Sequence, residues 1–98
     1  MVDTHRLFRF SVKCRSEDLA VVYCLRAIAE YSQKNINPRI AWGGTKDADW
    51  SRDGHCVTFH FSSAQNRDGF LQTAKRLLAQ GSWAEVARSD DDPAKPQN

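Results

Sequence analysis

The chain has 98 residues, of which 41% are hydrophobic and 10% are aromatic. This length supports one small domain with its own core and excludes two ordinary domains. Residues 1–89 carry 13 lysines and arginines and nine acidic residues, which is well short of the concentrated positive charge of a dedicated nucleic-acid-binding protein.

Residues 1–6 lack an apolar signal core, and no apolar run approaches the roughly 20 residues that span a bilayer. Cys14, Cys24 and Cys56 are widely spaced and lack the paired spacing of a zinc site. We therefore expect reduced thiols, a cytoplasmic location, no metal, no cofactor and no membrane contact.

Residues 7–14 alternate between apolar and polar side chains, which predicts a strand with two unlike faces. One face is apolar, with Phe8, Phe10 and Val12. The other face is polar and basic, with Arg9, Ser11 and Lys13. Because the apolar face serves the core, the basic face is available to bind a partner.

Ser16 and the two acidic residues after it predict the start of a helix. Apolar residues then follow at helical spacing: Val21, Val22, Leu25, Ile28 and Ala29. We expect this helix to end near residues 34–35, because Pro38 forces an extended chain before it. Residues 39–42, which begin with Arg39, predict a second, short strand.

Residues 45–54 predict a long, mobile polar loop with Trp50 at its middle and Arg52 beside it. The tryptophan either folds back onto the domain or anchors a partner, since Trp and Arg dominate interface energetics. Residues 55–61 predict a third strand. Its inward positions are Val57, Phe59 and Phe61, and its outward positions are Cys56, Thr58 and His60.

Ser62 and Ser63 predict the cap of a second helix that runs to a terminator at Gly81. Gly69 weakens this helix by about 1 kcal/mol relative to Ala, which is small beside the burial of its apolar face. Residues 83–88 alternate and predict a fourth strand. We expect residues 1–89 to form one domain and residues 90–98 to form a disordered acidic tail.

The predicted order is strand, helix, strand, strand, helix, strand. It resembles the ferredoxin-like split βαββαβ arrangement in topology, an α+β fold with a four-stranded antiparallel sheet and two helices on one face. In that arrangement the first and third strands are central and the second face of the sheet is open.

The open face and the loop around Trp50 are the predicted binding site. Its residues are Arg9, Ser11, Lys13, Arg39, Trp50, Arg52, Thr58 and His60. We expect a non-enzymatic binding or regulatory module for a macromolecular partner, because no acid, base and nucleophile converge in the sequence. A protein partner or a second copy of the chain is the first choice.

Single-stranded nucleic-acid binding is the alternative. Arg9, Lys13, Arg39 and His60 would contact phosphates, and Trp50 would stack on a base. RNA recognition domains share the predicted topology and place aromatic side chains on the open face, whereas here the phenylalanines fall on the opposite face. A metal site is not expected, because Cys56 and His60 lie roughly 13 Å apart along a strand and His55 points to the other face.

Overall fold

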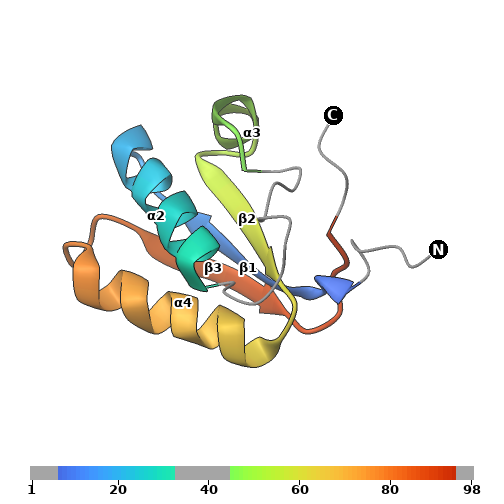
Figure 1. The fold of residues 1–98 in the computed structure, drawn as a ribbon. Helices are drawn as coiled ribbons and strands as arrows, with labels where there is room; N and C mark the ends of the chain where they lie inside the picture. Colours follow the sequence, from blue (N-terminus) through green and yellow to red (C-terminus); the bar gives the residue numbers. More distant parts are fainter. Residues whose placement is uncertain (1–6, 33–44, 95–98) are drawn as a thin grey trace.

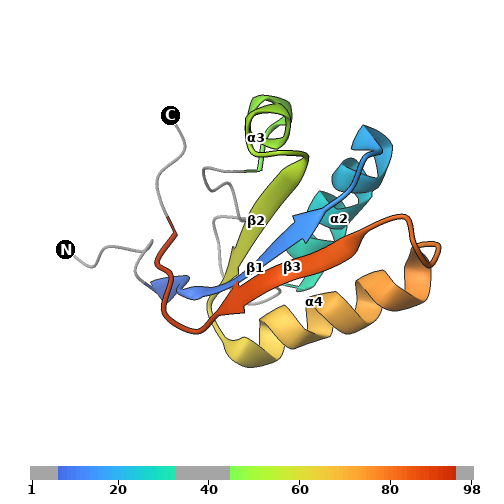
Figure 2. The ribbon, with the colours of Figure 1, turned by 180° about the vertical axis from the view of Figure 1, so that it is seen from behind.

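The computed structural model describes residues 7–32 and 45–94 of the chain (Figures 1 and 2). These residues form three strands and three helices. In chain order they are β1 (Phe10–Arg15), α2 (Leu19–Ser32), α3 (Asp47–Arg52), β2 (Cys56–Phe61), α4 (Ala64–Leu77) and β3 (Ala84–Ser89). Together they make a small α+β domain.

The strand β1 lies at the centre of an antiparallel sheet with the order β2-β1-β3. Along the β1–β2 pair, Phe10 lies opposite Phe61 and Arg15 lies opposite Cys56. Along the β1–β3 pair, Ser11 lies opposite Ser89. Both α2 and α4 cover the same face of the sheet, and Figure 2 shows the sheet in front of them. The opposite face has no helix over it in the described part of the chain.

The core lies between the sheet and the two long helices. The sheet contributes Val12, Val57, Phe59 and Phe61, and Phe8 just before β1 joins them; all five are buried. The ring of Phe70 on α4 lies 5.3 Å from the rings of both Phe59 and Phe61, measured between centroids. The alternation in the sequence therefore identified the buried side of the sheet correctly.

The predicted fold class is wrong in its number of elements. The described sheet has three strands instead of four, and the described residues form three helices instead of two. The expected strand at residues 39–42 lies outside the described residues. The third helix, α3, occupies the segment that was predicted to be a loop.

Local and distant contacts both favour α3. The carboxylate of Asp49 accepts a hydrogen bond of 3.1 Å from the backbone N–H of Lys46, which precedes the helix. Asp47 and Asp49 lie in the first turn and Arg52 in the last, so the charges complement the helix dipole. The side chain of Trp50 packs against the core and fixes the helix there.

Helix α4 begins at the predicted cap and ends early. The Ser63 hydroxyl accepts a hydrogen bond of 3.0 Å from the backbone N–H of Asn66, which confirms the cap. The helix ends at Leu77, and Gly81 instead takes a left-handed φ of 87° in the turn before β3. Position 81 therefore shapes a turn rather than terminating the helix.

Residues beyond β3 are tied to the rest of the domain. The buried guanidinium of Arg67 on α4 donates to the carbonyl of Ser89 (2.9 Å) and to the carboxylate of Asp90 (2.6 Å). The backbone N–H groups of Asp92 and Ala94 donate to the carbonyls of residues 9 and 8, at 2.8 and 2.9 Å. Residues 95–98 lie outside the described part, and the disordered tail stays a prediction.

None of the helices in residues 7–32 and 45–94 combines the length and apolar character that crossing a membrane requires.

Candidate partner-binding surfaces

The structure brings four of the predicted site residues together on the sheet face opposite the helices. Ser11 pairs with His60 and Lys13 pairs with Thr58 across the β1–β2 ladder. Directly opposed residues of an antiparallel pair point to the same face, so the four side chains are neighbours. Arg9 is exposed just before β1. Arg39 lies outside the described residues.

This face is partly closed at one end. Ser11 and His60 are buried, and the Nε2 atom of His60 lies 3.3 Å from a carboxylate oxygen of Asp92. Asp92 belongs to the segment that runs along the start of β1. Only Lys13 and Thr58 of the four remain partly exposed, so the accessible polar surface is smaller than the sequence suggested.

The cations at the other end of this face have carboxylate partners. Lys13 Nζ lies 3.1 Å from a carboxylate oxygen of Asp53. Glu17 receives hydrogen bonds from Arg15 (2.5 Å) and is 2.6 Å from Nδ1 of His55. Phosphate groups bind strongly where positive charge is unopposed, because binding then releases counterions. The pairing therefore weakens the case for a phosphate-binding face.

Trp50 folds back onto the domain, which decides between its two predicted roles. Its indole N–H donates a hydrogen bond of 2.7 Å to the carbonyl of Ser16, and its ring stacks on His55 at 4.4 Å between centroids. Arg52, by contrast, has a side chain that is 77% exposed and 4.0 Å from Asp49. The two residues therefore do not form one contact patch.

The connection from α3 to β2 uses two consecutive left-handed residues, Gly54 (φ 61°) and His55 (φ 68°). This conformation costs a non-glycine residue about 1 kcal/mol. The backbone N–H of His55 donates to the carbonyl of Trp50 at 2.8 Å, and its ring is held between Trp50 and Glu17. These contacts offset the strain and orient the start of β2.

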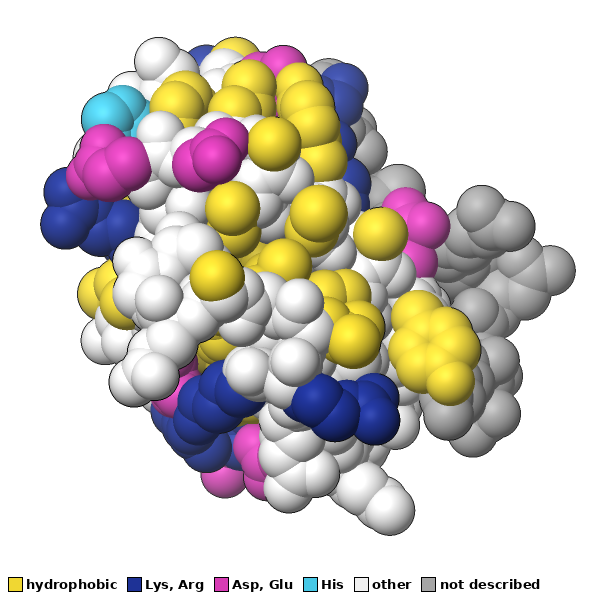
Figure 3. Space-filling model, turned by 90° about the vertical axis from the view of Figure 1, so that its left-hand side faces the viewer, with side chains coloured by type: hydrophobic (Ala, Val, Ile, Leu, Met, Phe, Trp, Pro, Cys, Tyr) yellow, Lys and Arg dark blue, Asp and Glu magenta, His cyan; other side chains and the backbone are white. Residues whose placement is uncertain are grey.

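The exposed side of α2 is a surface that the prediction missed. It carries small or aromatic side chains at helical spacing, namely Ala20, Tyr23, Cys24, Ala27 and Tyr31, and we call this set the α2 outer face. Tyr23 is 45% exposed and Tyr31 is 66% exposed. Figure 3 shows hydrophobic side chains gathered on the side of the molecule where α2 and the end of α4 lie.

The signal for this surface was present in the sequence. Within the 14 residues of α2, only Arg26 and Glu30 are charged. A surface helix ordinarily carries charged or polar residues on its outer side, and a helix that is apolar all round is ordinarily buried. Helix α2 therefore has one apolar side in the core and a second apolar side at the surface.

Helix α3 holds one aromatic ring of this face in place. The hydroxyl of Tyr23 donates a hydrogen bond of 2.6 Å to the carboxylate of Asp47, and this bond raises the pKa of Tyr23. The guanidinium of Arg26 lies 5.4 Å from the centre of the same ring and donates to the carbonyl of Thr45. The side chain is held at its hydroxyl and at one face of its ring, so it has less freedom to lose on binding than an unrestrained tyrosine.

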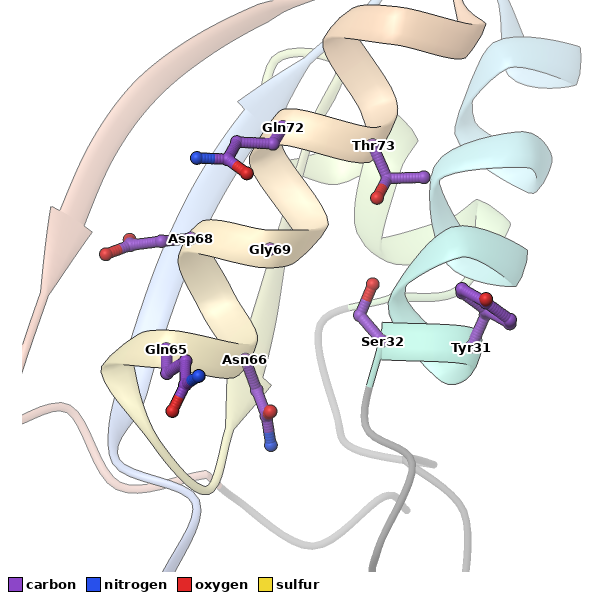
Figure 4. Close-up of a pocket in the computed structure, with 8 residues that line it drawn as sticks. All are labelled: Tyr31, Ser32, Gln65, Asn66, Asp68, Gly69, Gln72 and Thr73. Atoms are coloured by element: carbon purple, nitrogen blue, oxygen red, sulfur yellow. The ribbon is translucent and has the colours of Figure 1, made fainter.

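A groove of about 600 Å³ adjoins the α2 outer face at Tyr31. Figure 4 shows Ser32 of α2 and Thr73 of α4 between the two helices, whereas Asp68 and Gln72 point away from α2. The lining comprises Tyr31, Ser32, Gln65, Asn66, Asp68, Gly69, Gln72 and Thr73. No atom would lie within 4 Å of a Cβ added at Gly69, so this position has room for a side chain.

The cysteines and possible metal ligands of the described residues were natural candidates for chemistry. Burial, with smaller contributions from Glu85 and Cys56, raises the pKa of the Cys14 thiol to about 12, so the nucleophilic thiolate is scarce at neutral pH. Cys56 is buried and Cys24 is exposed. Among residues 7–32 and 45–94, no group of three or more His, Cys, Asp or Glu side chains is placed to hold a metal ion.

Comparison of the chain with protein-family models, with curated proteins and with solved structures finds no match.

Proposed function

We propose that the chain is a non-enzymatic binding module that recognises a protein partner through the α2 outer face. The observation that carries the proposal is an exposed helix side on which Tyr23 and Tyr31 stand among small residues. Aromatic residues are enriched in the buried centres of protein interfaces, whereas lysine, aspartate and glutamate are depleted there.

The surroundings of this face have the character of an interface rim. Arg26, Glu30 and Asp47 lie at its edge, and the groove beside Tyr31 is lined with amide and hydroxyl groups. A polar rim around an apolar centre is the usual anatomy of a specific protein contact. The proposed contact surface is therefore on α2, whereas the sequence had predicted it on the open sheet face and the Trp50 segment.

Nucleic-acid binding has weaker support. Lys13 and Arg15 are paired with carboxylates, and Trp50 already stacks on His55. A base or a phosphate would have to displace these contacts. Titration of the protein into labelled mixed-sequence single-stranded RNA and DNA, at low and physiological salt, tests this alternative. Saturable binding that survives physiological salt would overturn the choice of a protein partner.

A photo-crosslinking amino acid placed at position 27 tests the proposed surface directly. The matched control carries the same group at position 87, which is exposed on β3, on the sheet face opposite the helices. We expect discrete protein adducts in cells from position 27, few from position 87, and loss of the adducts when Cys24→Glu adds a charge to the face. Equal adducts from both positions, or none from position 27, would contradict the proposal.

A further inference from the structure

We propose that the partner of the α2 outer face is a second copy of this chain, with the two α2 helices antiparallel and related by a two-fold axis at Ala27. The inference rests on the proposed function, because it names the partner for that same surface. Three features of α2 carry it: the spacing of its side chains, the position of its charges and the area that it exposes.

The spacing of large and small side chains is symmetric about Ala27. Tyr23 lies four residues before it and Tyr31 four residues after it. In an antiparallel pair centred on Ala27, Tyr23 of each copy lies beside Tyr31 of the other. The small side chains of Ala27 and Cys24 let the helix backbones approach closely between the two aromatic pairs. A two-fold interface requires a self-complementary surface of this kind.

The two charges of α2 favour the antiparallel direction. Arg26 and Glu30 are four residues apart and lie on the same edge of the helix. With a rise of 1.5 Å per residue, Glu30 lies about 4.5 Å beyond Ala27 and Arg26 about 1.5 Å before it. In an antiparallel pair, Glu30 of one copy and Arg26 of the other are offset by only about 3 Å along the helix axis. In a parallel pair, the edge of α2 that carries Arg26 and Glu30 would instead face the other edge of the partner helix, which has no charged residue.

The exposed area predicts a weak dimer. At roughly 200 Å² per tyrosine, the exposed parts of Tyr23 and Tyr31 amount to about 220 Å² for each copy. This aromatic area is well below the roughly 800 Å² that each partner of a stable complex buries. The chain should therefore be mainly monomeric at about 10 µM and largely dimeric near 1 mM.

Sedimentation of the full chain between about 10 µM and 1 mM tests the inference. We expect the average mass to rise from monomer towards dimer over this range. Ala27→Glu places two like charges at the two-fold axis and should weaken association at least tenfold. Ala87→Glu, the same substitution on the exposed sheet face opposite the helices, should leave association unchanged. Circular dichroism checks that both variants are folded.

A disulfide probe tests the geometry. In a Cys24→Ala background, Ala27→Cys should form a covalent dimer under copper-catalysed air oxidation, because the two introduced thiols face each other across the axis. Ala87→Cys in the same background should not, because position 87 lies on the opposite side of the domain. A monomer at 1 mM, or equal crosslinking at both positions, would overturn the second copy as partner. If the dimer is ruled out but the photo-crosslinker at position 27 still captures a protein, the proposed function holds with a different partner. If no adduct forms at position 27, the proposed function is rejected as well.

Discussion

Replacing Trp50 tests whether its side chain stabilises the folded domain, as the structure indicates, or serves only to bind a partner. Trp→Ala at a fully buried site costs 3–5 kcal/mol, and Trp50 is only half-buried, so we expect a loss of about 2–3 kcal/mol in the free energy of unfolding. Trp50→Phe keeps most of the ring and removes the N–H that donates to Ser16, so its cost should be about 1–2 kcal/mol.

Urea unfolding followed by far-UV circular dichroism measures these losses, since two other tryptophans complicate a fluorescence signal. Arg52→Ala on the same helix is the control, and its exposed side chain should change stability by less than about 0.5 kcal/mol. A Trp50→Ala variant that unfolds within about 1 kcal/mol of the parent chain would refute the assignment of this side chain to the core.

Three further substitutions and modifications follow from the described contacts. Gly69→Ala should stabilise the protein by about 0.5–1 kcal/mol, because the position is helical and a Cβ meets no atom there; a loss of stability in urea would contradict this. Arg67→Ala should cost about 2–3 kcal/mol, because it removes a buried cation and the donor to the Ser89 carbonyl, and an unchanged melting temperature would show that this tie is dispensable. At pH 8 a thiol reagent should label Cys24 in the native protein and reach Cys14 only after unfolding, because burial raises the pKa of Cys14 to about 12; native-state labelling of Cys14, read by peptide mass spectrometry, would refute its burial.

Patterns that act within one element were read correctly from the sequence. The alternation in residues 7–14 and 55–61 identified the side of β1 and β2 that packs under the helices, because one face of a sheet has to be apolar. The outward positions Ser11, Cys56 and His60 are nevertheless buried. The cap at Ser63 was equally visible, because its partner Asn66 is only three residues away. Each of these features depends on near neighbours in the chain.

Features that depend on distant contacts were read incorrectly or missed. Helix α3 was predicted as a loop, because its anchor is a hydrogen bond from Trp50 to a carbonyl 34 residues earlier. The burial of His60 was missed because Asp92, far along the chain, lies against it. The α2 outer face is a different case, because its scarcity of charge is visible in residues 19–32, but the spacing of the buried residues is enough by itself to predict the helix.

The central place of β1 has a consequence for the order in which the protein is assembled. Among the described strands, β1 pairs with β2 and β3 only, and the last of these ends at Ser89. Synthesis at roughly 5–20 residues per second therefore delivers the centre of the sheet first and its final edge last. Until Ser89 has left the ribosome, β1 carries its apolar residues beside an unpaired edge, and such edges invite aggregation. The β3 edge of the first strand therefore stays open to pairing with another chain until residues 84–89 have been synthesised.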